Sequence, residues 1–228
     1  MGIKIKYFGH SCFMLEIEGK NILFDPFITS NPLAADVDVS TIHPDYILIS
    51  HGHGDHIADA ASIAQQSKSQ VIATYEVCEW LNKQGVVNFV PMNTGGRLDL
   101  GFCTVKLVYA AHSSSLPDGS YGGNPVGFVV RSNSGNFYYA GDTALTNEMQ
   151  LIPNECKLNF AILPVGDHFT MGIDDAAKAA KFIDCTKIIG MHFDTFPPIE
   201  INHENAKALF TSFGLELTLP TINQTLEF

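Results

Sequence analysis

Basic side chains are scarce in this chain of 228 residues, in which 13 lysines and arginines face 24 aspartates and glutamates. The formal net charge of −11 argues against binding to DNA or RNA, because nucleic-acid-binding proteins neutralise backbone phosphates with lysine and arginine. The few basic residues also form no run along the chain. We therefore expect no nucleic-acid partner.

Paired cysteines and long apolar segments are lacking as well. The five cysteines are an odd number, lie far apart and form no Cys-x-x-Cys pair, which favours free thiols over a disulfide framework. No apolar run approaches the roughly 18 residues that span a bilayer, and the opening stretch MGIKIKYFGH lacks the apolar core of a signal peptide. We expect a cytoplasmic protein without membrane contact.

Apolar segments of strand length recur through the whole chain. Hairpin-like alternation in IKIKYFG, CFMLEIE and ILFD is followed by strands that alternate with helix-like segments, and the second half repeats this order from GFVVRS onward. No linker, low-complexity tract or short-period repeat interrupts the pattern. The sequence predicts two mixed β-sheets flanked by helices. We expect one domain over residues 1–228, with pseudo-duplicated halves of about 1–110 and 111–228.

Metal-binding side chains cluster in the segment HGHGDH, directly after the apolar strand expected at Tyr46–Ser50. Imidazole and carboxylate groups are ligands for zinc, manganese and iron, and the two intervening glycines let the backbone coil tightly. Four ligands so close together in the chain do not all fit around one ion. The segment therefore predicts two ions and further ligands elsewhere, and its own ligands are His51, His53, Asp55 and His56.

Three other apolar strands end in a residue of the same kind, each just before a loop. The segments LVYAAH, NFYYAGD and KIIGMH end in His112, Asp142 and His192. Functional side chains are commonly presented on loops by a rigid scaffold. We expect one ion on His51, His53 and His112, the other on Asp55, His56 and His192, and Asp142 as a bridge between them. Such a pair of sites keeps an open position for water, which is the mark of a catalytic centre.

The order of HGHGDH with a later His, Asp and His resembles the defining motif of the metallo-β-lactamase superfamily. The early NILFDP is similar to that superfamily's first motif, in which Asp25 would support the ligand loop. Flanking segments such as GHSCF, GDHFTMG and MHFDTFP resemble its compact bacterial metal-dependent hydrolases, which are similar to ascorbate-6-phosphate lactonases. The resemblance implies an α+β fold, a four-layer αβ/βα sandwich with the site at one edge between the two sheets.

A centre of this kind predicts a dinuclear metal-dependent hydrolase. Two divalent cations, zinc before manganese or iron, would activate a bridging hydroxide and polarise the scissile bond of an ester, lactone, thioester or phosphoester. Because the cations outweigh the charges of Asp55, Asp142 and the hydroxide, a small anionic substrate is favoured. His168 and His10, which follow other apolar strands, are candidates for protonating the leaving group or for binding the substrate.

Three other functions compete with hydrolysis. A non-catalytic, metal-dependent binding protein could use the same ligands. A nuclease of the tRNA-processing type would need a basic surface or an added binding arm, and a net charge of −11 provides neither. A di-iron oxidoreductase on this fold usually carries a carboxylate where His53 stands, together with an appended flavin domain. The sequence leaves open the substrate and whether the chain forms a homo-oligomer.

Overall fold

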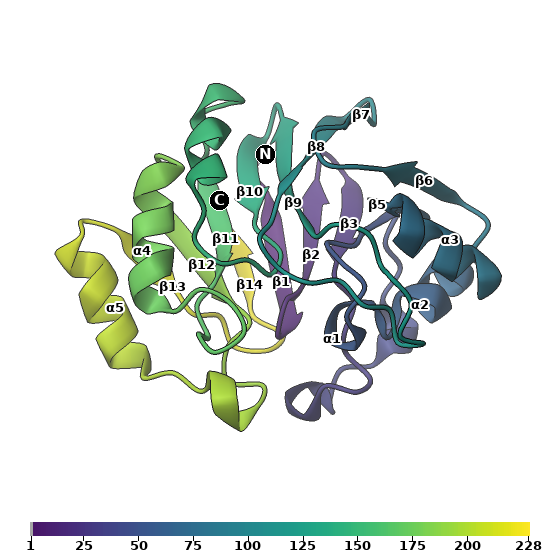
Figure 1. Cartoon of the computed structure of the whole chain (residues 1–228), viewed down its shortest axis with the longest axis horizontal. Helices are drawn as coiled ribbons and strands as arrows, with labels where there is room; N and C mark the ends of the chain where they lie inside the picture. Colours follow the sequence, from purple (N-terminus) through teal and green to yellow (C-terminus); the bar gives the residue numbers. More distant parts are fainter. Residues whose placement is uncertain (1) are drawn as a thin grey trace.

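The strands form two seven-stranded sheets in a computed structural model that describes residues 2–228. In order across the sheet, the first consists of β14 (Thr225–Glu227), β1 (Lys4–Gly9), β2 (Cys12–Ile17), β3 (Lys20–Phe24), β4 (Tyr46–Leu48), β5 (Gln70–Thr74) and β6 (Phe89–Met92). The second consists of β13 (Glu216–Thr218), β12 (Lys187–Met191), β11 (Phe160–Pro164), β10 (Gly135–Tyr139), β9 (Val126–Ser132), β8 (Cys103–Tyr109) and β7 (Arg97–Asp99). The last strand returns to the first sheet, which places the two termini close together (Figure 1).

Helices cover the outer sides of both sheets, so that the molecule has four layers (Figure 1). The chain segments that connect strands of the first sheet contain the helices η1 (Pro32–Ala34), η2 (Val39–Thr41), α1 (Gly54–Ile57), α2 (Ala60–Ser67) and α3 (Tyr75–Lys83). The segments that connect strands of the second sheet contain η3 (Asn147–Asn154), α4 (Ile173–Phe182), η4 (Pro197–Ile199) and α5 (His203–Ser212). This arrangement confirms the predicted αβ/βα sandwich. No helix within residues 2–228 is long and apolar enough to cross a membrane.

Each sheet joins an antiparallel region to a parallel one, and this decides where the strands end. β1, β2 and β3 are antiparallel neighbours, whereas β3, β4, β5 and β6 are parallel. In the second sheet β8, β9 and β10 are antiparallel neighbours, and β10, β11 and β12 are parallel. Consequently β3 and β4 end at one edge of their sheet, and β8, β10 and β12 end at one edge of theirs. The predicted ligands follow these ends.

Aromatic side chains join the inner faces of the two sheets. The Phe24 ring of β3 lies 6.0 Å from the rings of both Phe128 and Phe137, and 4.7 Å from the ring of Tyr139. Phe137 also stacks on Phe160 at 5.1 Å. All five side chains are fully buried. Removing this apolar area from water drives the sheets together, and the ring pairs add to that stabilisation.

Phe137→Ala is expected to lower the free energy of unfolding by about 3–5 kcal/mol, because it leaves a cavity between the sheets. The matched control is Phe213→Ala, since the Phe213 side chain is 41% exposed. That variant should lose about 1 kcal/mol or less. Chemical denaturation of the metal-free protein measures both changes. Equal losses would contradict a central role for the aromatic cluster in holding the sheets together.

Candidate metal centre

The seven predicted ligands gather where β4, β8, β10 and β12 end. Three groups of side chains bring their ligand atoms within 4.8 Å of one another, and one of them, Asp25 with His51 and His56, overlaps the other two. The first group is His51, His53 and His112, and the second is Asp55, His56 and His192 together with His10. The structure therefore unites the three residues expected at each ion, and it adds His10 to the second group. The HGHGDH segment follows β4 and runs into α1, so its side chains stand at the sheet edge.

Asp142 lies between the two groups. Its Oδ2 atom is 3.3 Å from Nε2 of His56 and 3.0 Å from Nε2 of His192, both in the second group. The same oxygen is 3.7 Å from Nε2 of His112 in the first group. The Asp142 side chain is only 2% exposed. A buried carboxylate in contact with imidazoles of both groups requires positive charge beside it.

The buried carboxylate of Asp25 forms hydrogen bonds with His56 and with Ser50, the residue that precedes the ligand segment. Its Oδ2 atom accepts hydrogen bonds from His56 Nδ1 at 2.9 Å, from Ser50 Oγ at 2.6 Å and from the Tyr139 hydroxyl at 2.7 Å. Its Oδ1 atom accepts from the Ser50 backbone N–H at 2.7 Å. Asp25 therefore supports the ligand loop as the resemblance implies. Donors from both sheets meet on this one side chain.

These hydrogen bonds assign the tautomers of two histidines. The single hydrogen of the Ser50 hydroxyl goes to Asp25, so Ser50 Oγ accepts from the Nδ1–H of His51 at 3.0 Å. His56 likewise donates its Nδ1–H to Asp25. Both rings therefore turn Nε2 toward the centre, where a metal ligand needs an unprotonated nitrogen.

The donor atoms fit divalent transition metals. His51 Nε2 lies 3.0 Å from Nδ1 of His53, whose Nε2 contacts Ser113 Oγ at 3.3 Å. This separation suits two nitrogens on one ion, since zinc–nitrogen bonds are about 2.0–2.1 Å long. Within residues 2–228, the buried atoms His56 Nε2 and Asp142 Oδ1 have no hydrogen-bond partner. A cation would satisfy both, and nitrogen and carboxylate ligands serve zinc, manganese and iron.

Burial and neighbouring charges set the protonation states. Burial lowers the pKa of His51 well below its ordinary value, and it lowers the pKa values of the other two histidines in the first group. Burial alone would raise the pKa of Asp142, but His192 and His56 hold it well below its usual range. Burial alone would lower the pKa of His56, but Asp142 raises it well above its ordinary value. A positive charge, either a proton or a metal cation, is therefore favoured between His56 and Asp142.

The two candidate proton donors lie in different surroundings. His10 Nε2 is 3.2 Å from Asp55 Oδ2, and the His10 side chain has no exposed surface. Burial lowers the pKa of His10 to about 4. His168 is exposed on the loop after β11 and lines a cavity with Asp174 and Glu200, and none of the seven predicted ligands lines that cavity. The structure thus brings His10 into the centre and leaves His168 outside it.

Three supporting residues escape prediction from the sequence. Ser50 and Tyr139 donate to Asp25, and Thr195 Oγ1 lies 2.9 Å from Nδ1 of His10. Ser50 carries a weak signal, because it immediately precedes the ligand segment. Tyr139 lies in an apolar strand beside another tyrosine, a context typical of core packing. Its role emerges only from the approach of the two sheets.

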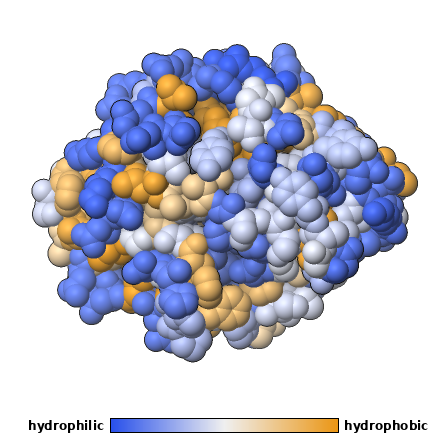
Figure 2. All heavy atoms as spheres, in the orientation of Figure 1, coloured by the Kyte–Doolittle hydropathy of each residue, from blue (hydrophilic) through white to orange (hydrophobic). Residues whose placement is uncertain are grey.

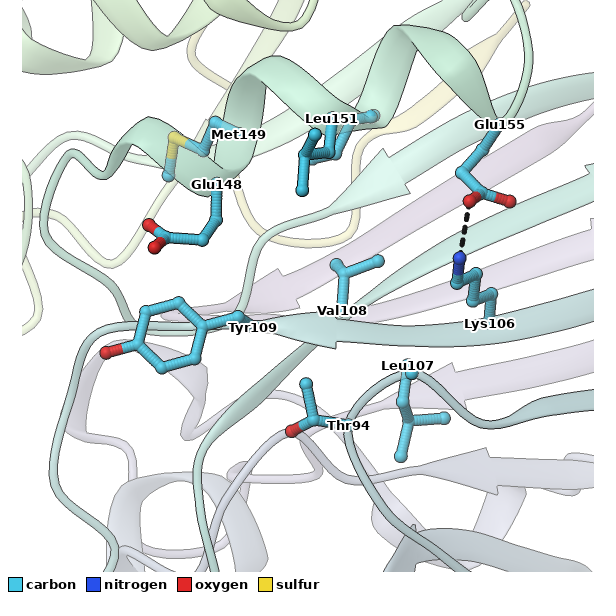
Figure 3. A pocket seen from close by; sticks show the side chains of 11 residues that line it. Thr94, Lys106, Leu107, Val108, Tyr109, Glu148, Met149, Leu151 and Glu155 are labelled. Atoms are coloured by element: carbon cyan, nitrogen blue, oxygen red, sulfur yellow. Dashed lines mark hydrogen bonds and ion pairs between the residues drawn. The ribbon is translucent and has the colours of Figure 1, made fainter.

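An apolar cavity of about 190 Å³ lies apart from the predicted ligands. It is lined mainly by β8 and η3, and none of the seven ligands lines it (Figure 3). Lys106 and Glu155 form an ion pair at one end, and Tyr109 and Glu148 lie toward the other. Figure 2 shows apolar side chains gathered among hydrophilic ones over this part of the surface. The histidine and aspartate groups, rather than this cavity, define the candidate site.

The chain is similar along nearly its whole length to metal-dependent hydrolases of other organisms. Residues 20–193 match the family model of the beta-lactamase superfamily domain. A metal-dependent hydrolase of Methylacidiphilum infernorum is 48% identical over 224 residues, which cover 98% of this chain and 99% of that protein. A metal-dependent hydrolase of Flavobacterium johnsoniae is 48% identical over 225 residues, 99% of this chain and 100% of that protein. The structure of a metallo hydrolase from Ignicoccus hospitalis is 32% identical with a TM-score of 0.89, covering 100% of this chain and 99% of that one.

Two adjacent tyrosines of β10 test the hydrogen bonds around Asp25. Tyr139→Phe is expected to lower the free energy of unfolding of the metal-free protein by about 1.5–3 kcal/mol, the usual contribution of a hydrogen bond to a charged group. Tyr138→Phe removes a buried hydroxyl that has no partner among the described residues, so it should leave stability unchanged or raise it. Chemical denaturation measures both variants. If the two were equally stable, the Tyr139 hydroxyl would have no part in holding the site.

Proposed function

The chain belongs to the metallo-β-lactamase superfamily, and on this premise we propose that it is a metal-dependent hydrolase with a two-ion centre. The observation that carries the proposal is the position of Asp142. Its buried carboxylate oxygen lies 3.3 Å from Nε2 of His56 and 3.7 Å from Nε2 of His112, which belong to different groups. A carboxylate in this position suits a ligand that two ions share.

Each group of side chains would hold one ion. The first ion would lie on His51, His53 and His112, the second on Asp55, His56 and His192, and Asp142 would be shared. Zinc suits these nitrogen and oxygen ligands, and manganese and iron use the same types. Ions bound here would supply Lewis acidity to the scissile bond and lower the pKa of water at the site. We propose an ester, lactone, thioester or phosphoester as the bond class, because negative charge develops on oxygen as such bonds are cleaved.

Substrate would approach from the side of Asp55, His53 and His112. The side chains of Asp55 and His112 are 31% and 14% exposed, and His53 is half-buried, whereas the other four predicted ligands are buried. Burial alone would raise the pKa of Asp55, but the hydrogen bond from His10 and the charge of His56 lower it. Asp55 is therefore a carboxylate that accepts hydrogen bonds rather than a proton donor.

His168 is the residue that we propose for bringing a proton to the leaving group. The loop that carries it is hydrogen-bonded to the residue after Asp142, because the Met171 N–H donates to the Thr143 carbonyl at 3.0 Å. The imidazole of His168 is exposed, so a substrate that extends from the centre to this loop would meet it. An exposed imidazole can act as a general acid toward a group within hydrogen-bond reach.

A small anionic molecule is the substrate class that we propose, in the cytoplasm. A net charge of −11 disfavours a polyanion such as RNA across the surface, whereas bound cations attract an anionic group locally. All five cysteines are free thiols, which suits a reducing compartment.

Asp142→Asn is expected to reduce hydrolysis by at least about 100-fold, because the amide removes the negative charge between the two groups. The matched control is Asp175→Asn on the exposed face of α4, where Asp175 pairs with Lys178, and it should leave the rate unchanged. Initial rates on lactones, thioesters and phosphodiesters, with zinc-, manganese- or iron-loaded enzyme, measure the effect. Wild-type rates in Asp142→Asn would exclude catalysis at this centre. Oxygen-dependent turnover of the iron form would replace hydrolysis by a redox function.

Metal loading is expected to raise the free energy of unfolding, because ions bind the assembled groups and not the unfolded chain. The gain is about 2.7 kcal/mol per site at a free metal concentration 100 times the Kd. Unfolding in the presence of zinc and of a chelator measures the gain, and elemental analysis of the same samples counts the ions. A protein that retains no transition metal after loading would contradict the two-ion proposal.

A further inference from the structure

His10 stands in the two-residue turn between β1 and β2 and faces the second group of predicted ligands. Its Nε2 lies 3.2 Å from Asp55 Oδ2, and its Nδ1 lies 2.9 Å from Thr195 Oγ1. Both ring nitrogens are therefore engaged, one on each side of the boundary between the sheets. Thr195 follows β12 of the second sheet, whereas Asp55 lies in α1 beside the first.

The backbone of His10 is held as firmly as its ring. Its carbonyl accepts a hydrogen bond from His192 N–H at 2.9 Å and another from the Tyr7 hydroxyl at 3.2 Å. His10 and His192 both have φ of 55°, in the left-handed region that costs free energy for residues with a Cβ. Such conformations persist where the surroundings determine them strongly. The turn is therefore fixed against the strand end that presents His192.

Neighbouring rings close the space around the His10 imidazole. The Phe27 and Phe196 rings meet it edge-on at 5.5 and 5.7 Å, and the His192 ring lies 4.1 Å away. The side chain has no exposed surface. A substrate therefore cannot touch this imidazole, and any effect of His10 on the reaction must pass through its neighbours.

The proton on the His10 ring is assigned by its partner. An Asp55 carboxylate only accepts hydrogen bonds, so Nε2 of His10 carries the hydrogen and donates it. Nδ1 then accepts from the Thr195 hydroxyl. This tautomer is the reverse of those of His51 and His56, which direct Nδ1–H away from the centre and leave Nε2 for an ion.

We propose that His10 is a positioning residue for the second ion: its Nε2–H fixes the Asp55 carboxylate beside His56 and His192, and His10 itself is not a ligand. The proposal rests on the proposed function, in which Asp55 binds that ion. Hydrogen-bond partners of metal ligands orient them and hold them at the distance that the ion needs. His10 would thereby connect two ligands, because its ring contacts Asp55 beside the first sheet and its carbonyl contacts His192 at the end of β12 in the second.

Two substitutions separate the contacts of His10. The His10→Asn amide can replace Nδ1 beside Thr195 but is too short to reach Asp55, and asparagine tolerates a φ of 55°. The His10→Gln amide reaches the position of Nε2 and can still donate to Asp55. Titration of zinc against a chromophoric chelator, followed for each ion in turn, measures the affinities. X-ray absorption at the zinc edge counts the imidazoles on zinc.

His10→Asn is expected to weaken the second ion about 10–100-fold while the first keeps its affinity. His10→Gln should recover most of that loss, with the wild-type number of imidazoles on zinc. His43→Gln, on an exposed histidine, is the matched control and should change nothing. Wild-type affinity of both ions in His10→Asn would overturn the proposal. It would also be overturned if His10→Gln lost the second ion as completely as His10→Asn, with one imidazole fewer on zinc, since His10 would then be a ligand.

Thr195→Val gives a second test in a side chain of nearly unchanged shape. Without the hydroxyl the His10 ring loses its Nδ1 partner, so the second ion should bind several-fold more weakly while the protein stays folded. Unchanged affinity in a variant with wild-type thermal stability would count against positioning by His10. Failure of the proposed function looks different, because the wild-type protein itself would then take up fewer than two ions.

Discussion

One buried carboxylate, that of Asp25, orients imidazoles in both groups of the centre. It accepts a hydrogen bond from His56 directly, and it accepts one from the Ser50 hydroxyl, which in turn accepts from His51. The orientation of both rings therefore depends on this one carboxylate. The Tyr139 hydroxyl adds a donor from the second sheet. An unpaired charge at this depth would cost several kcal/mol. The network is therefore favourable only while the sheets are packed together, which couples the geometry of the centre to the fold.

Sheet topology explains why such distant segments meet. In the first sheet, β3 and β4 are parallel neighbours. In the second, β8 and β10 run in the same direction because both are antiparallel to β9, and β11 and β12 are parallel neighbours. Strands that run in the same direction end at the same edge of their sheet. Each end then carries a residue with a polar side chain instead of continuing the strand. Asp25, His10 and His192 adopt positive φ angles of 42°, 55° and 55° at these ends. The backbone turns sharply there, and the close packing between the sheets maintains the strain.

Patterns that are local in the chain predicted two mixed sheets flanked by helices and the grouping of side chains at the centre, whereas the sandwich arrangement came from the family resemblance. Apolar strands followed by His or Asp marked each sheet edge, and HGHGDH raised the expectation of partners for two ions. Contacts between residues of different sheets could not be predicted from any local sequence pattern. Tyr139 donates to Asp25 from 114 positions away in the chain, and Thr195 contacts His10 from 185 positions away. Neither side chain differs in type or setting from an ordinary core or loop residue, so only the packed structure distinguishes them.

His10 and His168 have similar contexts in the sequence but differ in how deeply they are buried. Each follows an apolar strand, and each has a left-handed backbone. His10 occupies a two-residue hairpin turn whose neighbours on both sides are core strands, so its ring is enclosed and acts only on the groups it touches. The loop after β11 is longer and carries His168 outward, where it is exposed to solvent. This difference in depth suits the interior histidine to the proposed positioning of Asp55, and the surface histidine to the proposed contact with a leaving group. Turn length, rather than residue type, separates the two proposed roles.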